Sequence, residues 1–424
     1  MTQAQVLIVG SGRAGIAAAE TLRGDGFRGD VTILGEESVP YDRPQCSKSV
    51  LTGHARPRDV WLPVRQGTSV RWRLGRRAVG LDPYNRVVTT DTGEEFGYDG
   101  LVIATGARPS PPSDWPIGAP GLHQLHTLSD SWRLRQDLRD AGRVAIIGGG
   151  LTGCEVACSM WSMGRDCVLI DSNPQVMNRA LGEVVGALVT AEVQRAGISL
   201  RLGRRVSQLN RLKRGWLIVL DNGEQIRADL VVTTIGDRPD TAWLDGTPLD
   251  VTDGVLCDES LRVVGADGIV AAGAVARWPN LRYRRTPRRC GQWIAALEQG
   301  NAAAQTLLRG PWARPVTILP RFWTEQFGLR IQVCGDQPAG AEVTVTEMRP
   351  GRRDTARAGV LVSHSVEGRL VGLVAVNAPH AFTAMARVLI ANTVPVKPAT
   401  VIPVSPAPRA ISQYAHGDRR ARVA

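Results

Sequence analysis

The stretch Gln5-Val6-Leu7-Ile8-Val9-Gly10-Ser11-Gly12-Arg13-Ala14-Gly15 stands near the start of the chain. An apolar run leads into the pattern G-x-G-x-x-G, and an alanine-rich segment follows at residues 16–23. This order predicts a strand, a tight turn and a helix that together hold a pyrophosphate. Gly10 permits the turn, Gly12 lets backbone N–H groups reach the phosphates, and Gly15 lets the helix pack on the strand. The stretch therefore predicts a nucleotide-binding site.

A second strand and a second glycine pattern extend this interpretation. The apolar residues 31–34 are followed by Glu36, near the spacing at which a carboxylate meets the adenosine ribose. The same arrangement recurs at residues 143–153, and the apolar strand after it ends in Asp171. The glycines of the second pattern are Gly148, Gly150 and Gly153. Two such units on one chain predict two bound dinucleotides.

Composition excludes several classes of protein. The chain has 424 residues, of which 43% are hydrophobic and 21% charged, as in globular proteins of two or three domains. No apolar run approaches the length of a membrane span, so we expect a cytoplasmic protein that does not enter the membrane. The seven cysteines lack metal-ligand or disulfide spacing, so no metal is expected. The net charge of +11 would attract nucleic acid, an anionic membrane or an acidic protein, and composition does not choose between them.

The rest of the chain predicts a duplicated α/β architecture and a smaller last domain. A proline-punctuated loop at residues 39–48 brings Arg43 and Lys48 close to the first phosphate site. The segment 104–109 is echoed by 235–239, and a proline-rich linker at 110–120 separates the two units. Further predicted elements are strands at 70–74, 86–91, 101–105 and 230–234, a hairpin at 216–220 and 225–228, and helices at 181–196, 292–308 and 380–392.

The chain resembles the two-dinucleotide flavoprotein superfamily, and within it the oxygenase-coupled ferredoxin reductases that serve cytochromes P450 and Rieske dioxygenases. The resemblance covers the chain to about residue 390. It depends on an ordered set of motifs: both glycine patterns, Tyr41-Asp42-Arg43-Pro44 with Ser47-Lys48, 104–109, Ala271-Ala272-Gly273, Leu297-Glu298-Gln299 and Phe322-Trp323-Thr324-Glu325-Gln326.

The resemblance implies that the first unit holds FAD and the second holds NADH. The implied FAD-binding residues are Gly10, Gly12, Ala14, Gly15, Glu36, Arg43, Lys48, Val79, Thr105, Gly106, His126, Gly273, Ala274 and Trp293. The implied NAD-binding residues are Gly148, Gly150, Gly153, Glu155, Asp171 and Gly236. Acidic Asp171 would repel the 2′-phosphate of NADPH, which favours NADH.

The implied fold has two Rossmann-like, three-layer ββα domains and a small α+β domain. We expect an FAD-binding domain at 1–112 and 241–315, an NAD(H)-binding domain at 113–240, a C-terminal domain at 316–394 and a poorly ordered tail at 395–424.

The implied electron acceptor is a [2Fe–2S] ferredoxin. An arginine cluster precedes the helix that begins near residue 292, and it would attract an acidic ferredoxin from a distance. The cluster consists of Arg282, Arg284, Arg285, Arg288 and Arg289. No nucleic-acid-binding signature accompanies this charge, so we do not expect a nucleic-acid partner. The sequence leaves the oligomeric state open.

Four places depart from the pattern of these reductases, one of them being Cys290-Gly291-Gln292-Trp293, which replaces a Glu-His/Ser type segment. Ala274 stands where relatives have an aspartate, and losing that charged hydrogen bond weakens FAD binding by an expected ten- to a hundredfold, on the order of 1.5–3 kcal/mol. His126 stands where relatives usually have an arginine. These two changes leave open a homologue with weakened FAD binding. Cys46 leaves open a reductase of a thiol, peroxide or other small acceptor, which would need a thiolate with a lowered pKa.

Overall fold

The computed structural model of the chain describes residues 4–283, 286–348 and 358–391. Contacts between residues divide it into two compact units. The first unit comprises residues 1–172 and 198–322, and the second comprises residues 173–197 and 323–424. The tail expected at 395–424 lies outside the described residues.

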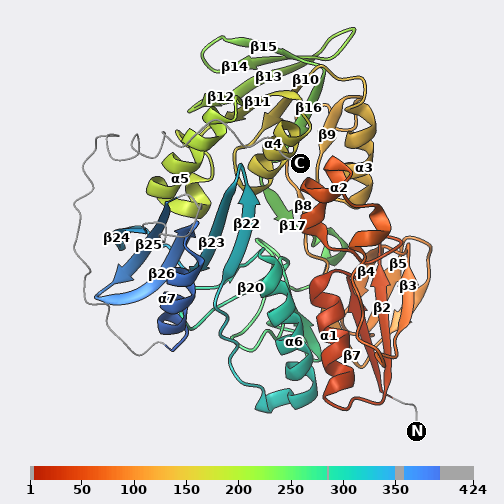
Figure 1. Cartoon of the computed structure of the whole chain (residues 1–424). Coiled ribbons are helices and arrows are strands. Elements are labelled where there is room, and N and C mark those ends of the chain that lie inside the picture. Colours follow the sequence, from red (N-terminus) through yellow and green to blue (C-terminus); the bar gives the residue numbers. More distant parts are fainter. Residues whose placement is uncertain (1–3, 284–285, 349–357, 392–424) are drawn as a thin grey trace. The chain divides into compact units, whose positions relative to one another are not determined.

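The first glycine pattern belongs to a five-stranded parallel sheet in the first unit (Figure 1). Its strands, in spatial order, are β19 (Ile269–Ala271), β7 (Gly100–Ile103), β1 (Gln5–Val9), β2 (Asp30–Gly35) and β3 (Arg71–Leu74). The four residues of β7 are all buried, as expected for a central strand covered on both faces. Helices α1 (Arg13–Gly24) and α6 (Trp293–Arg309) pack side by side against this sheet.

The second glycine pattern belongs to another five-stranded parallel sheet of the same unit. Its strands, in spatial order, are β12 (Ser199–Leu202), β11 (Asp166–Asp171), β10 (Arg143–Ile147), β16 (Leu230–Thr233) and β9 (Leu122–Gln124). Helix α4 (Leu151–Ser162) follows β10, and α3 (Leu128–Asp137) follows β9.

A three-stranded antiparallel sheet accompanies each parallel sheet, which gives the three layers expected from the sequence. These sheets are β4 (Ala78–Asp82), β5 (Val87–Thr90) and β6 (Glu95–Gly97) in the first half, and β13 (Val206–Arg211), β14 (Trp216–Leu220) and β15 (Gln225–Ala228) in the second. Val88 of β5 is fully buried in the same hydrophobic cluster as Ile8 of β1, so the two layers share one core. The fold class predicted from the sequence is confirmed.

The chain passes between the two halves through a pair of short strands. Strand β8 (Ala107–Pro109) pairs antiparallel with β17 (Asp237–Pro239), and Arg108 lies opposite Arg238. These strands lie in the two similar segments, 104–109 and 235–239. The similarity therefore marks the two places where the chain crosses between the halves, and there the two segments pair with each other.

Short elements complete the first unit. They are η1 (Arg43–Ser47), α2 (Ser49–Thr52), η2 (Pro57–Val60), η3 (Ala242–Leu244), β18 (Val255–Leu256), β20 (Ala276–Trp278), β21 (Arg288–Arg289) and η4 (Gly310–Trp312).

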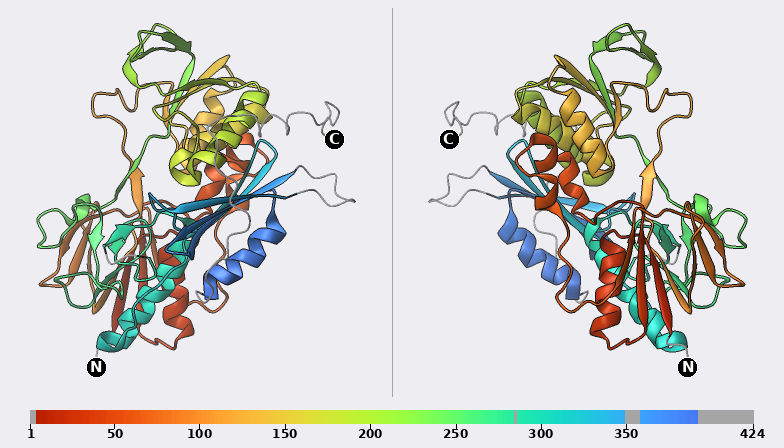
Figure 2. Two further views of the ribbon diagram at one scale, coloured as in Figure 1. Left: turned by 90° about the vertical axis from the view of Figure 1, so that its left-hand side faces the viewer. Right: turned by 90° about the vertical axis from the view of Figure 1, so that its right-hand side faces the viewer.

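The second unit contains an antiparallel sheet and two helices (Figure 2). Its strands, in spatial order, are β22 (Arg321–Gln326), β23 (Leu329–Gly335), β26 (Arg369–Val376), β25 (Gly359–Val366) and β24 (Glu342–Met348). Helix α7 (Pro379–Ala391) packs on β26 and β23. Helix α5 (Asn178–Arg195) is kinked at Gly182, whose φ is +73°. The contact-based division places α5 here, although it falls within the expected 113–240 domain.

Candidate cofactor-binding site

The first glycine loop has the backbone that phosphate binding requires. Gly10 has φ +116°, and a Cβ atom built there would lie 2.1 Å from the carbonyl oxygen of Ala104. A Cβ atom at Gly15 would lie 1.9 Å from the carbonyl oxygen of Gly10. Gly12 is the N-cap of α1, no side chain caps that helix end, and no atom stands within 4 Å of a built Cβ. The loop therefore leaves an open helix N-terminus facing free space, which suits a phosphate.

This loop opens onto a cavity of about 630 Å³, a size typical of ligand sites. The cavity brings together most of the residues expected to bind FAD. Those lining it are Gly10, Gly12, Ala14, Glu36, Arg43, Thr105, Gly106, His126, Gly273, Ala274 and Trp293. Gly15 acts behind the loop, and Ala78 lines the wall in place of its neighbour Val79, whose side chain is 49% exposed.

Glu36 is held at the end of β2 by an arginine that sequence reasoning did not select. The guanidinium of Arg108 contacts the Glu36 carboxylate, and its Nε lies 2.8 Å from Oδ1 of Asp240. Both Arg108 and Asp240 line the cavity. The similarity between segments 104–109 and 235–239 was the available signal, because Arg108 lies in one crossing strand and Asp240 directly follows the other.

Arg43 is oriented by a network of contacts in the cavity lining. Its Nη2 donates to Oε1 of Glu37 at 2.7 Å, its Nη1 donates to the carbonyl oxygen of His126 at 2.8 Å, and its guanidinium lies 5.2 Å from the ring centre of Tyr41. Burial, followed by the charge of Arg43, lowers the pKa of His126 from 6.5 to about 4. His126 is therefore neutral at physiological pH, and Arg43 carries the positive charge here.

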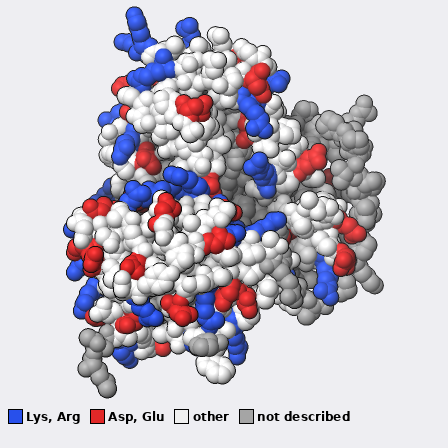
Figure 3. Space-filling view, turned by 180° about the vertical axis from the view of Figure 1, so that it is seen from behind, with Lys and Arg blue, Asp and Glu red and all other residues white. Residues whose placement is uncertain are grey.

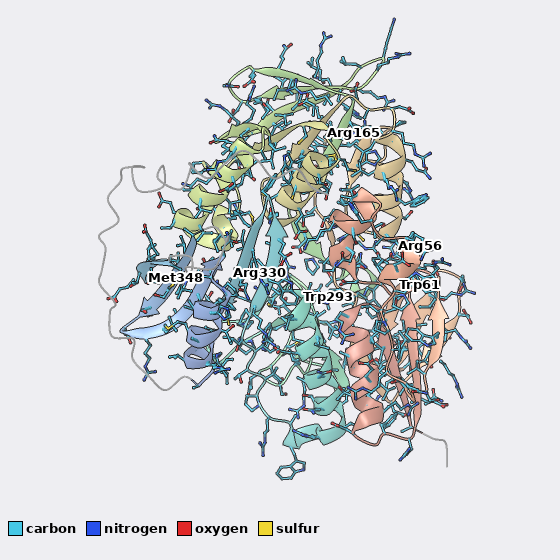
Figure 4. All side chains as sticks on the ribbon, in the orientation of Figure 1. Arg56, Trp61, Arg165, Trp293, Arg330 and Met348 are labelled. Carbon is cyan, nitrogen blue, oxygen red and sulfur yellow. The ribbon has the colours of Figure 1, made fainter. Side chains whose placement is uncertain are left out.

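The start of α6 contributes to the cavity lining. Trp293 is the first residue of this helix (Figure 4), and it lines the cavity. Gln299, fully buried in α6, accepts a hydrogen bond from the Gly273 N–H at 2.6 Å and so fixes the turn that presents Ala274. No side chain caps the helix at Gln292, so its first N–H groups are available to an electronegative ring edge.

Lys48 does not line the cavity and instead contacts the helix of the second glycine pattern. Its Nζ lies 2.9 Å from Oε1 of Glu155 in α4, and Ser47 Oγ donates to Oε2 of the same carboxylate at 2.6 Å. Glu155 is buried, so these two residues satisfy its charge. Lys48 was expected to bind FAD and Glu155 to bind NAD, and in the structure these two residues form an ion pair with each other.

The second glycine loop repeats the first. Gly148 has φ +109°, Gly150 is the N-cap of α4 without a side-chain cap, and a Cβ atom at Gly153 would lie 1.7 Å from the Gly148 carbonyl oxygen. Asp171 ends β11 and accepts a hydrogen bond from the Gly149 N–H, which places its carboxylate beside the loop. Gly236, with φ +57°, precedes the crossing strand β17.

Cys46 lies away from the cavity lining. It is buried with Tyr41, Val50 and Val60 in a small hydrophobic cluster. Burial raises the pKa of its thiol to about 12. A redox thiol needs the opposite shift, so this environment does not favour the thiolate.

The predicted docking arginines have different surroundings. Arg284 and Arg285 lie outside the described residues. Arg289 is 18% exposed and is engaged by Asp253, with Nε 2.8 Å from Oδ1, and by the carbonyl oxygen of Ala274 at 3.3 Å. Arg288 is exposed in β21 and Arg282 is partly exposed. Figure 3 shows one face of the molecule, on which lysines and arginines are interspersed with acidic side chains.

Residues 4–283, 286–348 and 358–391 contain no cluster of three or more potential metal ligands. No helix in these ranges is long and apolar enough to cross a membrane.

Comparison with known proteins identifies the class. The model of the pyridine nucleotide-disulphide oxidoreductase family matches residues 4–300, and that of the reductase C-terminal domain matches residues 321–408. The chain therefore belongs to the pyridine nucleotide-disulphide oxidoreductase family, and it is an FAD-dependent NAD(P)H oxidoreductase.

Individual relatives narrow the class to one type of reductase. The chain is 31% identical to the ferredoxin–NAD(+) reductase component of the biphenyl dioxygenase system of Paraburkholderia xenovorans, over 91% of this chain and 92% of that protein. It is 30% identical to the corresponding subunit of the benzene 1,2-dioxygenase system of Pseudomonas putida, over 98% and 99%. The reductase in a covalent putidaredoxin reductase–putidaredoxin complex matches with a TM-score of 0.83 at 25% identity, over 98% and 99% of the two chains. The resemblance predicted from the motifs is confirmed.

Residues of the first site fit FAD. The uncapped end of α1, the space beside Gly12 and the acidic Glu36 are the groups that a bound dinucleotide requires. Trp293 lines the same cavity, which gives room for a further ring system.

Proposed function

We propose that this protein takes electrons from NADH and delivers them, through FAD, to a ferredoxin that serves a P450 or Rieske oxygenase. The observation that carries the proposal is the presence of two glycine loops in one compact unit, one of them opening onto a cavity of about 630 Å³. The reductase relatives matched over nearly the whole chain support the same activity.

The chain's own residues bind and orient the two dinucleotides. FAD, when bound, accepts a hydride and releases single electrons. Glu36 would bind the adenosine ribose, the open end of α1 would bind the pyrophosphate, and Trp293 would limit one side of the flavin. Gly148, Gly150 and Gly153 would hold NADH, with Asp171 on its ribose. The remaining site residues expected from the sequence belong to the same proposal. So does the division into domains at 1–112 with 241–315, 113–240 and 316–394.

The partner is proposed to be an acidic [2Fe–2S] ferredoxin. The net charge of +11 supports an acidic partner, because long-range attraction raises association rates. Among the described members of the predicted cluster, Arg288 is exposed, whereas Arg289 is engaged by Asp253. A cytoplasmic location is proposed because all seven cysteines are free thiols, as is usual in a reducing compartment.

The test measures electron delivery directly. Purified protein should show flavin absorbance, should bleach on anaerobic addition of NADH more readily than with NADPH, and should reduce cytochrome c only when a [2Fe–2S] ferredoxin is added. Raising the ionic strength should slow the ferredoxin-dependent rate several-fold, because surface attraction is screened. A rate independent of ferredoxin, or unaffected by salt, would contradict the proposed partner. A protein that stays colourless after incubation with FAD would contradict the cofactor.

A further inference from the structure

Six arginines line the flavin cavity, and only half of them are neutralised by acidic neighbours. The three with acidic partners are Arg43, Arg76 and Arg108. The three without a carboxylate within 4.0 Å, among the residues that the structure describes, are Arg13, Arg77 and Arg133. An arginine without an acidic partner in a cavity is available to an anionic ligand.

Arg13 stands at the open end of α1. It is the first residue of this 12-residue helix, directly after the uncapped Gly12. Its side chain and the free N–H groups of the first turn therefore place positive charge at one point of the cavity. The anion expected at this point is a phosphate.

Arg133 reaches the same cavity from a different helix, α3. The N-terminus of α3 is already closed, because Thr127 and Asp130 form a capping box and the Tyr41 hydroxyl accepts from the Leu128 N–H at 3.0 Å. Helix α3 therefore contributes a guanidinium to the cavity and not its backbone amides.

The remaining polar groups make these two arginines more important. His126, beside α3, is neutral at physiological pH, since burial lowers its pKa to about 4. Ala274, which also lines the cavity, offers no charged side chain to the ligand. The positive charge available to an anion therefore comes from Arg13, Arg77 and Arg133, and of these Arg13 and Arg133 belong to helices, α1 and α3.

We propose that Arg13 and Arg133 clamp the pyrophosphate of FAD, one from the helix of the first glycine loop and the other from α3. The clamp rests on the proposed FAD site and assigns two binding residues to it. It also joins the two halves of the first unit, because α1 follows the first sheet's central strand and α3 belongs to the second sheet's half. FAD would therefore bind mainly through its pyrophosphate, and its affinity would depend on salt.

The experiment titrates FAD into flavin-free protein and follows quenching of flavin fluorescence. Arg133→Ala and Arg13→Ala should each weaken FAD binding by roughly tenfold, the usual effect of losing one charge-assisted hydrogen bond. Arg139→Ala is the matched control: Arg139 is an exposed arginine just beyond α3 that does not line the cavity. Its variant should bind FAD like the unaltered protein. Circular dichroism shows whether each variant keeps its secondary structure.

Salt and competition identify the phosphate as the group recognised. The affinity of the unaltered protein should fall as ionic strength rises, and this dependence should be shallower in Arg133→Ala. Inorganic pyrophosphate should displace FAD from the unaltered protein at lower concentration than from Arg133→Ala. Arg133→Lys should fall between the two, because it keeps the charge without the planar guanidinium.

Two outcomes separate the clamp from the proposed function. If Arg133→Ala binds FAD with unchanged affinity and unchanged salt dependence, the clamp is wrong while the flavin site stands. If the unaltered protein binds no FAD, the proposed function itself fails.

Discussion

The two glycine loops have nearly the same backbone but different surroundings. Their first glycines have φ values of +116° and +109°, and their third glycines would place a Cβ atom 1.9 and 1.7 Å from a carbonyl oxygen of their own loop. The first loop opens onto the 630 Å³ cavity, whose lining includes no residue of the second loop.

The acidic residues after the second strands also differ. Glu36 turns toward Arg108 in the cavity wall, whereas Asp171 turns back onto the Gly149 N–H of its own loop. The helices behind the loops differ too. Gly300 lets α6 lie against α1, since a Cβ atom there would be 2.2 Å from the Ala14 carbonyl oxygen, while α4 carries the buried Glu155. One local motif is therefore placed in two settings: beside the 630 Å³ cavity, and beside a carboxylate, Asp171, that bonds back to its own loop.

The largest expected effect comes from a methyl group at the third glycine of each loop. Gly15→Ala should weaken FAD binding on the order of a hundredfold, because the Cβ atom overlaps a backbone oxygen and forces the loop to move. Gly153→Ala should weaken NADH binding similarly and leave FAD in place. Fluorescence titration of each variant with FAD and with NADH measures which of the two ligands binds more weakly. Equal loss of both ligands in either variant would mean that the loops are not independent sites.

The next effect concerns the ion pair between the halves. Lys48→Met should lower the free energy of unfolding by about 2–3 kcal/mol, because the buried Glu155 carboxylate loses its cationic partner. Urea denaturation of the flavin-free protein provides the measurement. Glu155→Gln, which can still bond to Ser47, should cost less in the Lys48→Met background than alone. Additive losses in that double variant would show that Lys48 and Glu155 do not interact.

The smallest effect is a difference in acid sensitivity at the first site. The pKa of folded His126 is about 4, below the 6.5 of the unfolded chain. Above pH 6.5 both states are neutral and the residue has no effect. Between pH 6.5 and pH 4 the unfolded state takes up the proton first, so the free energy of unfolding decreases as the pH is lowered. His126→Gln should remove about 1–2 kcal/mol of this loss.

The measurement compares unfolding curves of the unaltered protein and of His126→Gln between pH 7 and pH 4. This range covers the pKa of about 4 in the folded protein, and the difference between the two proteins gives the stability lost through His126. The pKa values of His123 and His364 are lowered as well, so the difference between the two proteins is the relevant quantity. Parallel curves would show that His126 titrates normally in the folded state.

Much of the architecture was predictable because local patterns determine it. The apolar runs, glycines and terminal acids predicted both parallel sheets, and the hairpin at 216–220 and 225–228 has the bounds expected. The strands β4, β6 and β9 were not predicted. They are short, partly exposed segments whose alternation is too brief to be distinguished from loops.

The site was predictable only where the contact is local in sequence or carried by the family resemblance. The glycine loops and Glu36 follow from neighbouring residues. The Arg108–Asp240 and Lys48–Glu155 pairs join positions more than one hundred residues apart, and their formation depends on how the chain crosses between the sheets. The environment of Cys46 is a tertiary property too, because the pKa of a thiol depends on burial that a loop sequence does not reveal.

The pairing of β8 with β17 has a consequence for how this chain could be taken apart. Pro109 lies opposite Asp237, so the segment between them leaves and returns at neighbouring points. All five strands of the first parallel sheet lie outside that segment. A deletion bridged by a few turn residues would therefore keep this sheet and the first glycine loop, although it would remove His126 and Arg133 from the cavity lining.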